Sequence, residues 1–333
     1  MNTKRWVAIF LAAALFLTGS AVSLISTVFS TNLEDLFATP ERGFEENIIE
    51  EGNGQGKIAV IHLSGVIQSN YDTPSLFQSP GYNHRTFLKK LDAAAEDPNV
   101  HGVVIRVNTP GGGVVESQEI HDMIVDIQDD YEKPVYISMG SMAASGGYYI
   151  AAPAERIYAN PQTLTGSIGV IMQSINVAEL AEDLGIHSEV IKSGPYKDIM
   201  SVTREMTEDE RAILQELIDE SHELFVDVID NGRENLSRDE VYELADGRIY
   251  SGSQALEAGL IDGLGHFEEV LDDIREDVGR GNLDVVEYQS HLGLPSLFSV
   301  AAKSVFSDQL QLYGMKEWMQ QNQGPQLLYL YTN

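Results

Sequence analysis

The strongest constraint on the fold is a repeated change of periodicity after residue 56. Short apolar runs at residues 57–67, 101–107 and 134–139 are rich in β-branched side chains, which is typical of buried strands. Between them, residues 86–96 and 115–129 place apolar side chains at helical spacing. Strands that alternate with helices in this way predict an α/β fold with parallel strands.

The alternation continues toward the C-terminus. We expect further helices at residues 145–152 and 177–184, and short strands at 156–159, 168–172 and 188–191. A long helix should begin at Thr207, because Thr207-Glu208-Asp209-Glu210 has the form of a capping box. It should run to about residue 230, with Ile213, Leu217, Phe225 and Val228 on its apolar side. Residues 236–264 predict a pair of helices with a glycine-containing hinge.

The N-terminal end has the pattern of a membrane segment. Lys4 and Arg5 precede an uncharged, mostly apolar run at residues 6–29. At about 1.5 Å per residue, this run is long enough to cross a hydrocarbon core of about 30 Å. Basic flanks stay in the cytoplasm, so we expect residues 1–5 to be a cytoplasmic stub and the rest to lie outside. A signal peptide cut after the small residues 19–21 is the alternative; the apolar run beyond them favours the anchor.

Three further parts follow this anchor. Residues 30–56 read as an acidic juxtamembrane linker, residues 57–290 as the folded domain and residues 291–333 as a C-terminal extension. The apolar, β-prone residues 326–331 near the end predict a strand at the edge of the core. Alternatively, they lie as a peptide in a substrate groove of their own or a neighbouring subunit.

Composition excludes several classes of ligand and site. The chain has 21 Lys+Arg against 51 Asp+Glu, a formal net charge of -30 at pH 7. Such a surface repels nucleic acid and anionic lipid headgroups, so we expect no nucleic-acid partner. The acidity itself is explained by solubility or by a salty or alkaline medium. The absence of cysteine excludes disulfides, thiolate metal sites and cysteine nucleophiles.

Three glycine-rich segments at the ends of predicted strands carry the candidate chemistry. Residues 108–113 (Asn-Thr-Pro-Gly-Gly-Gly) form a turn that can direct backbone N–H groups at an anion. Residues 140–149 place Ser145 at a strand-to-helix turn among small residues. There its Oγ can reach a substrate, and the following N–H can stabilise an oxyanion. Residues 164–170 lead from a loop into a strand. Each segment taken alone is also compatible with an ordinary packed turn.

Ser141 is an alternative nucleophile. Residues 140–143 (Gly-Ser-Met-Ala) echo the nucleophile segment of subtilisins. No matching Asp and His segments precede them in the order that such a triad requires. The echo is therefore weak, and Ser145 is preferred.

A serine nucleophile needs a base, and Lys197 is the better choice. The eight histidines are scattered, and none lies in a local catalytic motif. Lys197 follows residues 188–191 in the segment Ser-Gly-Pro-Tyr-Lys-Asp. A free lysine has a pKa of about 10.4, and burial lowers that pKa until the amine can accept a serine proton. The alternative is an ordinary solvated loop lysine.

The motifs occur in an order that closely resembles the bacterial S49 serine peptidases, the family of signal peptide peptidases. They are Thr-Pro-Gly-Gly at 109–112, Ala-Ser-Gly-Gly-Tyr-Tyr at 144–149, Thr-Gly-Ser-Ile-Gly-Val at 165–170, Tyr-Lys at 196–197, Gly-Arg-Ile-Tyr-Ser-Gly at 247–252 and Gly-Leu-Ile-Asp at 259–262. The resemblance covers about residues 57–265, and the chain has the length of the short, single-unit form of Gram-positive bacteria.

The resemblance implies a ClpP/crotonase-like α/β fold with repeated β-β-α units, preceded by one N-terminal transmembrane helix. The site residues that it implies are the nucleophile Ser145, the general base Lys197, the lysine-positioning Ser167 and the oxyanion-hole N–H groups of Gly112 and Gly146. Gly113 replaces Gly112 if the loop register shifts by one residue.

The function that the resemblance implies is a membrane-anchored serine endopeptidase that degrades remnant signal peptides, without a metal or organic cofactor. Its catalytic domain would be extracellular, and its partners would be hydrophobic peptides, the membrane and copies of itself. Members of the short form assemble into a dome-like octamer in which neighbouring subunits supply the serine and lysine of each site. A crotonase-like acyl-CoA enzyme and a non-catalytic membrane scaffold are the alternatives; CoA binding and labelling by a serine-reactive probe would distinguish them.

Overall fold

The computed structural model describes residues 44–69, 82–289 and 327–331. The predicted cytoplasmic stub and membrane anchor lie outside these residues, as does most of the C-terminal extension. Within the described ranges, no helix is both long enough and apolar enough to cross a membrane.

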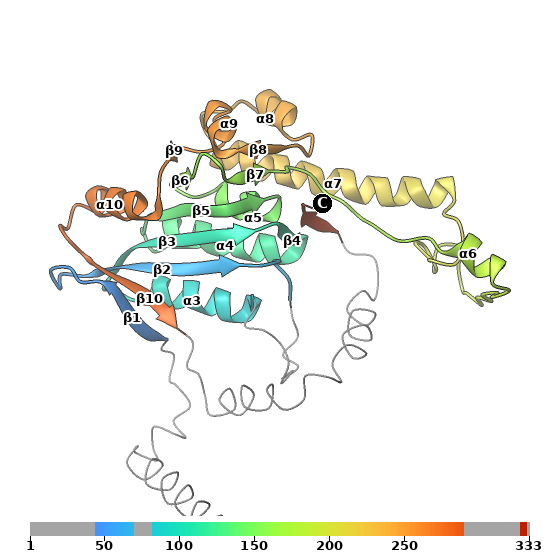
Figure 1. Ribbon diagram of the computed structural model, residues 1–333, viewed down its shortest axis with the longest axis horizontal. Coiled ribbons are helices and arrows are strands. Elements are labelled where there is room, and N and C mark those ends of the chain that lie inside the picture. The colour runs from blue at the N-terminus through green and yellow to red at the C-terminus, as the bar shows by residue number, and fades with distance from the viewer. Residues whose placement is uncertain (1–43, 70–81, 290–326, 332–333) are drawn as a thin grey trace, which may run out of the picture. The chain divides into compact units, whose positions relative to one another are not determined.

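A mixed, mostly parallel β-sheet forms the centre of the described part (Figure 1). Its strands are β1 (Glu45–Glu50), β2 (Lys57–Ser64), β3 (Val100–Thr109), β5 (Val135–Ala144), β6 (Arg156–Ala159), β7 (Leu164–Gly166), β8 (Ile249–Ser251), β9 (Gly263–Leu264) and β10 (Asp284–Gln289). The order across the sheet is β1-β10-β2-β3-β5-β6-β9, with β7 beside β5 and β8 beside β7. The pairs β1–β10 and β7–β8 are antiparallel, and the other pairs are parallel. The predicted α/β class is therefore confirmed.

Helices cover both faces of the sheet. They are α3 (His84–Glu96), α4 (Val114–Asp129), α5 (Gly146–Ala151), α6 (Ala178–Asp183), α7 (Glu208–Gly232), α8 (Arg238–Leu244), α9 (Gly252–Glu257) and α10 (Phe267–Val278). Along β2, Ala59 and Ile61 pack into the core shared with α3, α4 and α5, whereas Ile58 and Val60 pack on the opposite face with α10. Burial of both faces explains why this strand is a continuous apolar run.

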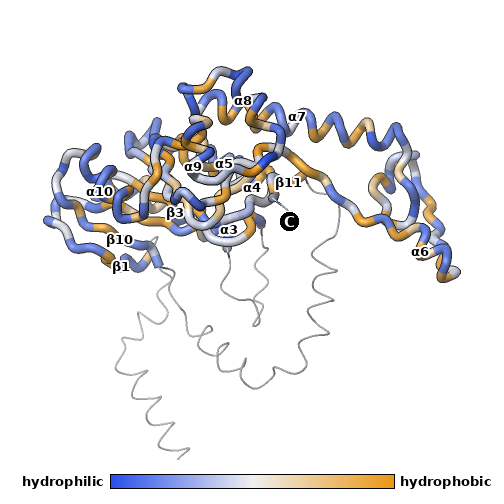
Figure 2. Tube along the Cα trace, turned by 45° about the horizontal axis from the view of Figure 1, so that its top comes forward, coloured by the Kyte–Doolittle hydropathy of each residue, from blue (hydrophilic) through white to orange (hydrophobic). Residues whose placement is uncertain are grey.

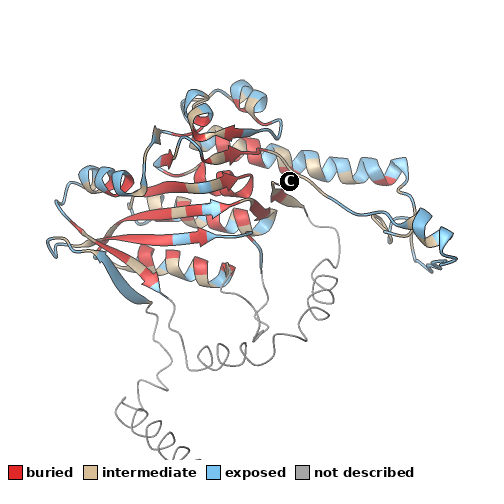
Figure 3. Ribbon diagram, in the orientation of Figure 1, coloured by how far each residue is buried: buried red, intermediate tan, exposed pale blue. Residues whose placement is uncertain are grey.

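The long helix α7 begins at the predicted capping box. The Glu210 N–H donates to Thr207 Oγ1 at 3.2 Å, and the Thr207 N–H donates to the Glu210 carboxylate at 2.9 Å. The predicted apolar side is only half covered, because Phe225 is buried while Leu217 is 42% exposed. Figure 3 shows this change along α7, from buried positions near the sheet to exposed ones toward α6.

Two of the predicted strands do not form. At residues 168–172 there is only an isolated bridge between Ile171 and Leu328, and the strand lies earlier, at Leu164–Gly166. Residues 188–191 are irregular, and Val190 and Ile191 are exposed. Apolar character suggested a strand there, but a strand also needs a neighbouring sheet edge to pair with, and this segment has none.

Two other segments differ in detail from their predictions. Residues 45–50, which the sequence places in the linker, form the edge strand β1 against β10. Residues 236–264 do contain two helices, α8 and α9, and the short strands β8 and β9 accompany them. The folded unit therefore begins before residue 57.

Candidate active site

Ser145 lies at the turn between β5 and α5, in a conformation unfavourable for a residue with a side chain. Its backbone angles are φ 52° and ψ -115°. The neighbouring pairing holds it there: Ala144 pairs with Gly166 of β7, and the Ser145 N–H donates to the Gly166 carbonyl at 2.7 Å. Strained backbone of this kind is concentrated at functional sites.

The hydroxyl group of Ser145 is buried and unpartnered. The residue is 1% exposed, and its Oγ makes no hydrogen bond to any described residue. An unmade hydrogen bond of a buried polar group costs about 1–3 kcal/mol, so such a group needs an explanation. The next residue, Gly146, begins α5, and the first N–H groups of a helix have no partner within the helix. The Ser145 hydroxyl and the first N–H groups of α5 therefore lie together.

The glycine segment after β3 presents Gly112 to the same place. Gly111 and Gly113 both face Ile67: the Ile67 N–H donates to the Gly111 carbonyl at 2.8 Å, and the Gly113 N–H donates to the Ile67 carbonyl at 2.8 Å. Successive residues of a strand present their N–H and C=O groups to opposite sides, so the N–H and C=O groups of Gly112 point away from Ile67, although the two backbones are in close contact. The N–H group of Gly113, the alternative oxyanion donor, is thus already engaged.

The side that Gly112 faces is occupied by the C-terminal strand. A second sheet pairs β4 (Gly111–Gly113) with β11 (Leu328–Leu330) in antiparallel fashion, with Tyr329 opposite Gly112. The Tyr329 carbonyl oxygen would lie 2.0 Å from a Cβ at Gly111 and 3.1 Å from a Cβ at Gly146. Only glycine at these two positions lets the strand approach so closely. β11 therefore lies against both glycine segments beside Ser145.

The side chain of Tyr329 fills an aromatic pocket next to this strand. Its ring centroid lies 4.8 Å from that of Tyr149 and 4.7 Å from that of Phe225. Its hydroxyl donates to the Ser221 carbonyl at 2.9 Å. The residue is fully buried. Residues of α5 and α7 thus form a deep, mostly apolar pocket with one polar acceptor.

Ser167 is brought to the site by β7. It follows Gly166, whose carbonyl accepts the Ser145 N–H, and it is buried, with φ 50°. Its own N–H donates to the Arg248 carbonyl at 2.8 Å. The antiparallel pairing of β7 with β8 therefore places the Gly-Arg-Ile-Tyr-Ser-Gly motif directly behind the site.

Lys197 does not join these residues within one chain. It lies on residues 173–207, here called the arm, which include α6 and lead into α7. In Figures 1 and 2, α6 lies at the far end of α7, away from the sheet. Lys197 is exposed, and Ser145 Oγ has no hydrogen-bond partner among the described residues. The structure therefore groups Ser145, Gly112, Gly146 and Ser167 and leaves the predicted base apart.

Ser141, the alternative nucleophile, lies elsewhere on β5. It precedes Ser145 by about 13 Å of extended strand and lines a different cleft, of about 300 Å³, with Arg106, Asn160 and His266. In the parts of the chain that the structure describes, no group of His, Asp and Glu side chains is arranged to hold a metal ion. The glycine segments therefore converge on Ser145 and not on Ser141.

The sequence analysis missed the charged residues that surround Lys197. Asp198 and Arg204 pair with each other, and Arg204 also pairs with Glu210 of the capping box. The available signal was an aspartate directly after Lys197, with an arginine in the same loop and an acidic capping residue beyond it.

Comparison with known proteins identifies the family. Residues 127–280 match peptidase family S49. A protein of Enterococcus faecium named as a candidate signal peptide peptidase, SppA, is 38% identical over 298 residues, which are 87% of this chain and 86% of the relative. The chain belongs to the S49 peptidase family. The predicted resemblance is confirmed, and S49 membership makes the protein a serine protease.

Two further S49 relatives differ in how much of their own length is matched. A candidate protease of Synechocystis is 43% identical over 213 residues, 64% of this chain and 71% of the relative. Protease 4 of Salmonella typhi is 34% identical over 216 residues, 65% of this chain but 34% of the relative. These two matches each cover about two thirds of this chain.

Proposed function

We propose that this S49 protease is a membrane-anchored endopeptidase that degrades remnant signal peptides with a Ser145–Lys197 dyad. The observation that carries the assignment of the nucleophile is the buried, unpartnered Ser145 hydroxyl at a strained turn between two glycine segments. A buried hydroxyl without a partner is poorly explained by packing alone. It is well explained by a partner that arrives with another subunit or with substrate.

The proposed reaction uses these groups in two halves. The neutral Lys197 amine takes the proton from Ser145 Oγ, which attacks the peptide carbonyl carbon. The resulting oxyanion is stabilised by the N–H groups of Gly112 and Gly146. The Lys197 ammonium then protonates the leaving amine, and the C–N bond breaks. In the second half, the amine takes a proton from water, and the hydroxide hydrolyses the acyl-enzyme to release the acid and free Ser145. Ser167 would hold the lysine by a hydrogen bond.

We infer that the Lys197 used by each site comes from a second copy of the chain. Within one chain the two side chains do not meet, and the arm exposes many large apolar residues that a partner would cover. These residues are Ile175, Leu180, Leu184, Ile186, Val190, Ile191, Tyr196 and Val202. Figure 2 shows hydrophobic positions recurring on α6 and along α7. Burial in such an interface would also favour the neutral amine that the mechanism needs. A ring such as an octamer supplies one lysine to every serine.

The substrate would bind as an extended strand beside β4. The C-terminal strand β11 supports this proposal, because its backbone pairs with Gly112 and its Tyr329 ring packs against Tyr149 and Phe225. Apolar remnant signal peptides suit such a groove, and the name of the Enterococcus relative points to the same substrate class. The uncharged run at residues 6–29 would keep the enzyme at the membrane, with its catalytic domain on the outer face.

The ClpP/crotonase-like variant of the α/β class belongs to the same proposal. The succession of β3, β4 and α4, and of β6, β7 and α6, is consistent with repeated β-β-α units. An acyl-CoA enzyme of that fold would share the glycine oxyanion hole. Membership of a peptidase family favours proteolysis over that alternative, and we expect no CoA binding.

The decisive test is cleavage of a fluorogenic hydrophobic peptide by the full-length protein. Ser145→Ala and Lys197→Ala should each lower kcat by about 10³-fold or more, as loss of a nucleophile or its base does in other serine proteases. Ser141→Ala is the matched control and should keep wild-type activity. An active, folded Ser145→Ala variant would show that the nucleophile is another residue.

A further inference from the structure

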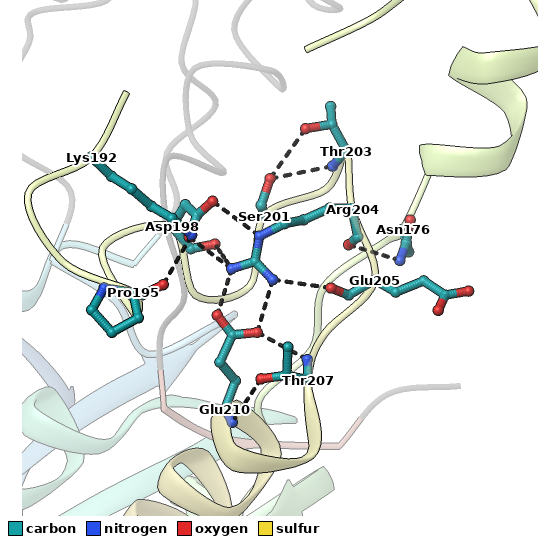
Figure 4. Close-up of polar contacts among 10 residues, drawn as sticks. All are labelled: Asn176, Lys192, Pro195, Asp198, Ser201, Thr203, Arg204, Glu205, Thr207 and Glu210. Atoms are coloured by element: carbon teal, nitrogen blue, oxygen red, sulfur yellow. Dashed lines mark hydrogen bonds and ion pairs between the residues drawn. The ribbon is translucent and has the colours of Figure 1, made fainter. Parts of the chain in front are cut away.

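Arg204 forms ion pairs with two carboxylates, those of Asp198 and Glu210. Its Nε and Nη2 atoms donate to the two carboxylate oxygens of Asp198 at 2.9 and 2.7 Å. Nη1 and Nη2 donate to the two carboxylate oxygens of Glu210 at 2.8 and 2.5 Å. The guanidinium also donates to the carbonyls of Asp198 and Glu205, both at 3.0 Å. Figure 4 shows the planar group lying between the two acids.

The first of these carboxylates belongs to the turn that carries Lys197. Asp198 is the next residue in the chain, and its side chain is also the acceptor for Lys192 Nζ at 2.6 Å. Lys192 Nζ donates in addition to the Pro195 carbonyl at 2.9 Å, so it spans the start of the same turn. The Asp198 carboxylate therefore binds Lys192, before the Lys197 turn, and Arg204, after it.

The second carboxylate belongs to a rigid element. Glu210 is 2% exposed and forms the capping box that begins α7. At its other end, α7 packs into the core through Phe225, Val226 and Ile229. Arg204 thus links the Lys197 turn to a helix that is anchored in the main body of the protein.

We propose that Arg204 is a positioning residue that sets the place of the Lys197 amine by holding Asp198 against Glu210. This inference rests on the proposed role of Lys197 as the base. The guanidinium is suited to the task because its rigid fork binds both oxygens of each acid, whereas a lysine in its place would present one flexible point charge. A base on an exposed arm needs such a constraint, since an error of about 1 Å in a catalytic group can cost about 100-fold in rate.

The two carboxylates of the clamp formed by Asp198, Arg204 and Glu210 stay ionised near neutral pH. Hydrogen bonds from Arg204, with further bonds from Lys192, hold the pKa of Asp198 well below its usual value. Hydrogen bonds from Arg204 likewise lower the pKa of Glu210 to about 2. Groups with lowered pKa values contribute stability above the usual carboxyl pKa of about 4 and lose it as the pH falls through the lowered values. Near neutral pH the clamp therefore stays closed.

The test compares the peptide-cleavage kinetics of full-length variants. In folded, assembled Arg204→Ala, kcat should fall by about 100-fold while KM changes by less than about threefold. KM should be nearly unchanged because we propose that the substrate binds beside β4 and not on the arm. Arg204→Lys keeps the charge without the fork, and its kcat should fall by about tenfold. Added guanidinium ion should restore part of the kcat of Arg204→Ala, which a merely structural role would not predict.

Arg238 provides the matched control. It bridges Asp227 at 2.7 Å and Asp230 at 3.1 Å and also pairs with Glu223, so it too binds several acids of α7, but far along the helix from Lys197. Arg238→Ala should keep the wild-type kcat. Wild-type kcat in folded Arg204→Ala, or an equal loss in Arg238→Ala, would overturn the proposal. If Arg204→Ala does not assemble, Asp198→Asn decides instead: a lowered kcat supports the clamp and a wild-type value refutes it.

The same assays separate this inference from the dyad itself. If Lys197→Ala is inactive while folded Arg204→Ala behaves as wild type, the dyad stands and the positioning role is wrong. If folded Lys197→Ala remains active, the assignment of the base is wrong and the role of Arg204 falls with it.

Discussion

Ser145 is held by its neighbours in a conformation that its own side chain disfavours. Ser145 has a φ of 52°. The pairing of Ala144 with Gly166 holds the backbone before it, and the start of α5 holds the backbone after it. Such a residue stores about 1–3 kcal/mol of strain. Its hydroxyl is buried and unpartnered, so the nucleophilic role that we propose would be a case of stability given up for reactivity.

Relief of this strain can be measured. Ser145→Gly should be more stable than Ser145→Ala by about 1 kcal/mol, because glycine adopts positive φ freely. The strain energy that is relieved should exceed the entropic cost of ordering a glycine on folding. Both variants should be inactive. Denaturant unfolding of the two proteins gives the difference directly.

The control for this comparison is Ser141 on the same strand. Ser141 is not among the residues with positive φ, so Ser141→Gly should be less stable than Ser141→Ala by about 0.5–1 kcal/mol. If Ser145→Gly is also the less stable of its pair, the strain at Ser145 does not exist in solution.

At the scale of elements, β11 is the most informative part of the fold. The strand comes from the far end of the chain, yet it lies against β4 and the start of α5, next to Ser145. Residues 328–330 do form a strand, and the substrate groove that we propose is the place that this strand occupies. A tail that occupies a substrate groove should compete with substrates.

Removal of the tail tests this competition. Truncation after Gln323 should lower KM for short peptides by about tenfold, because a tethered competitor at high effective concentration is lost. It should also lower the free energy of unfolding by about 3 kcal/mol, since Tyr149 and Phe225 lose the Tyr329 ring. Tyr329→Ala, which keeps the chain length, should show most of the decrease in the free energy of unfolding. Unchanged kinetics and an unchanged self-cleavage pattern after truncation would count against a tail in the groove.

At the scale of the whole molecule, the separation of Lys197 from Ser145 means that the dyad we propose requires assembly of at least two copies. The arm exposes its apolar residues, and the buried serine lacks a partner among the described residues. Both features are accounted for if the arm of one copy reaches the serine of the next. The net charge of -30 would keep such an assembly soluble and away from anionic surfaces.

Mixing of two inactive variants tests the shared site. Ser145→Ala supplies an intact lysine and Lys197→Ala an intact serine, so co-assembled subunits should regain about a quarter of wild-type activity, the statistical share of complete sites in a symmetric ring. Each variant mixed with wild type serves as the control for assembly. A verified monomer with full activity would exclude a site built from two subunits.

Local chemistry in the sequence was enough to predict the α/β class and the strand-to-helix turn at Ser145. Periodicity identifies β2, β3 and β5, because burial of both faces of a parallel sheet leaves continuous apolar runs. The turns at Ser145 and at the glycines 111–113 depend on neighbouring residues in the chain, so they can be predicted without knowledge of the fold. The capping box at Thr207 is equally local, and it forms as predicted.

What only the tertiary structure decided are the relations between residues far apart in the chain. The absence of a strand at residues 188–191 follows from the lack of a sheet edge there, which no local pattern records. The pairing of Tyr329 with Gly112, the engagement of Gly113 by Ile67 and the distance of the arm from Ser145 depend on packing. The Arg204 clamp likewise appears only when its carboxylates meet in space. The sequence therefore determined the local turns and caps that present the candidate groups, and the fold decided which of these groups one chain brings together.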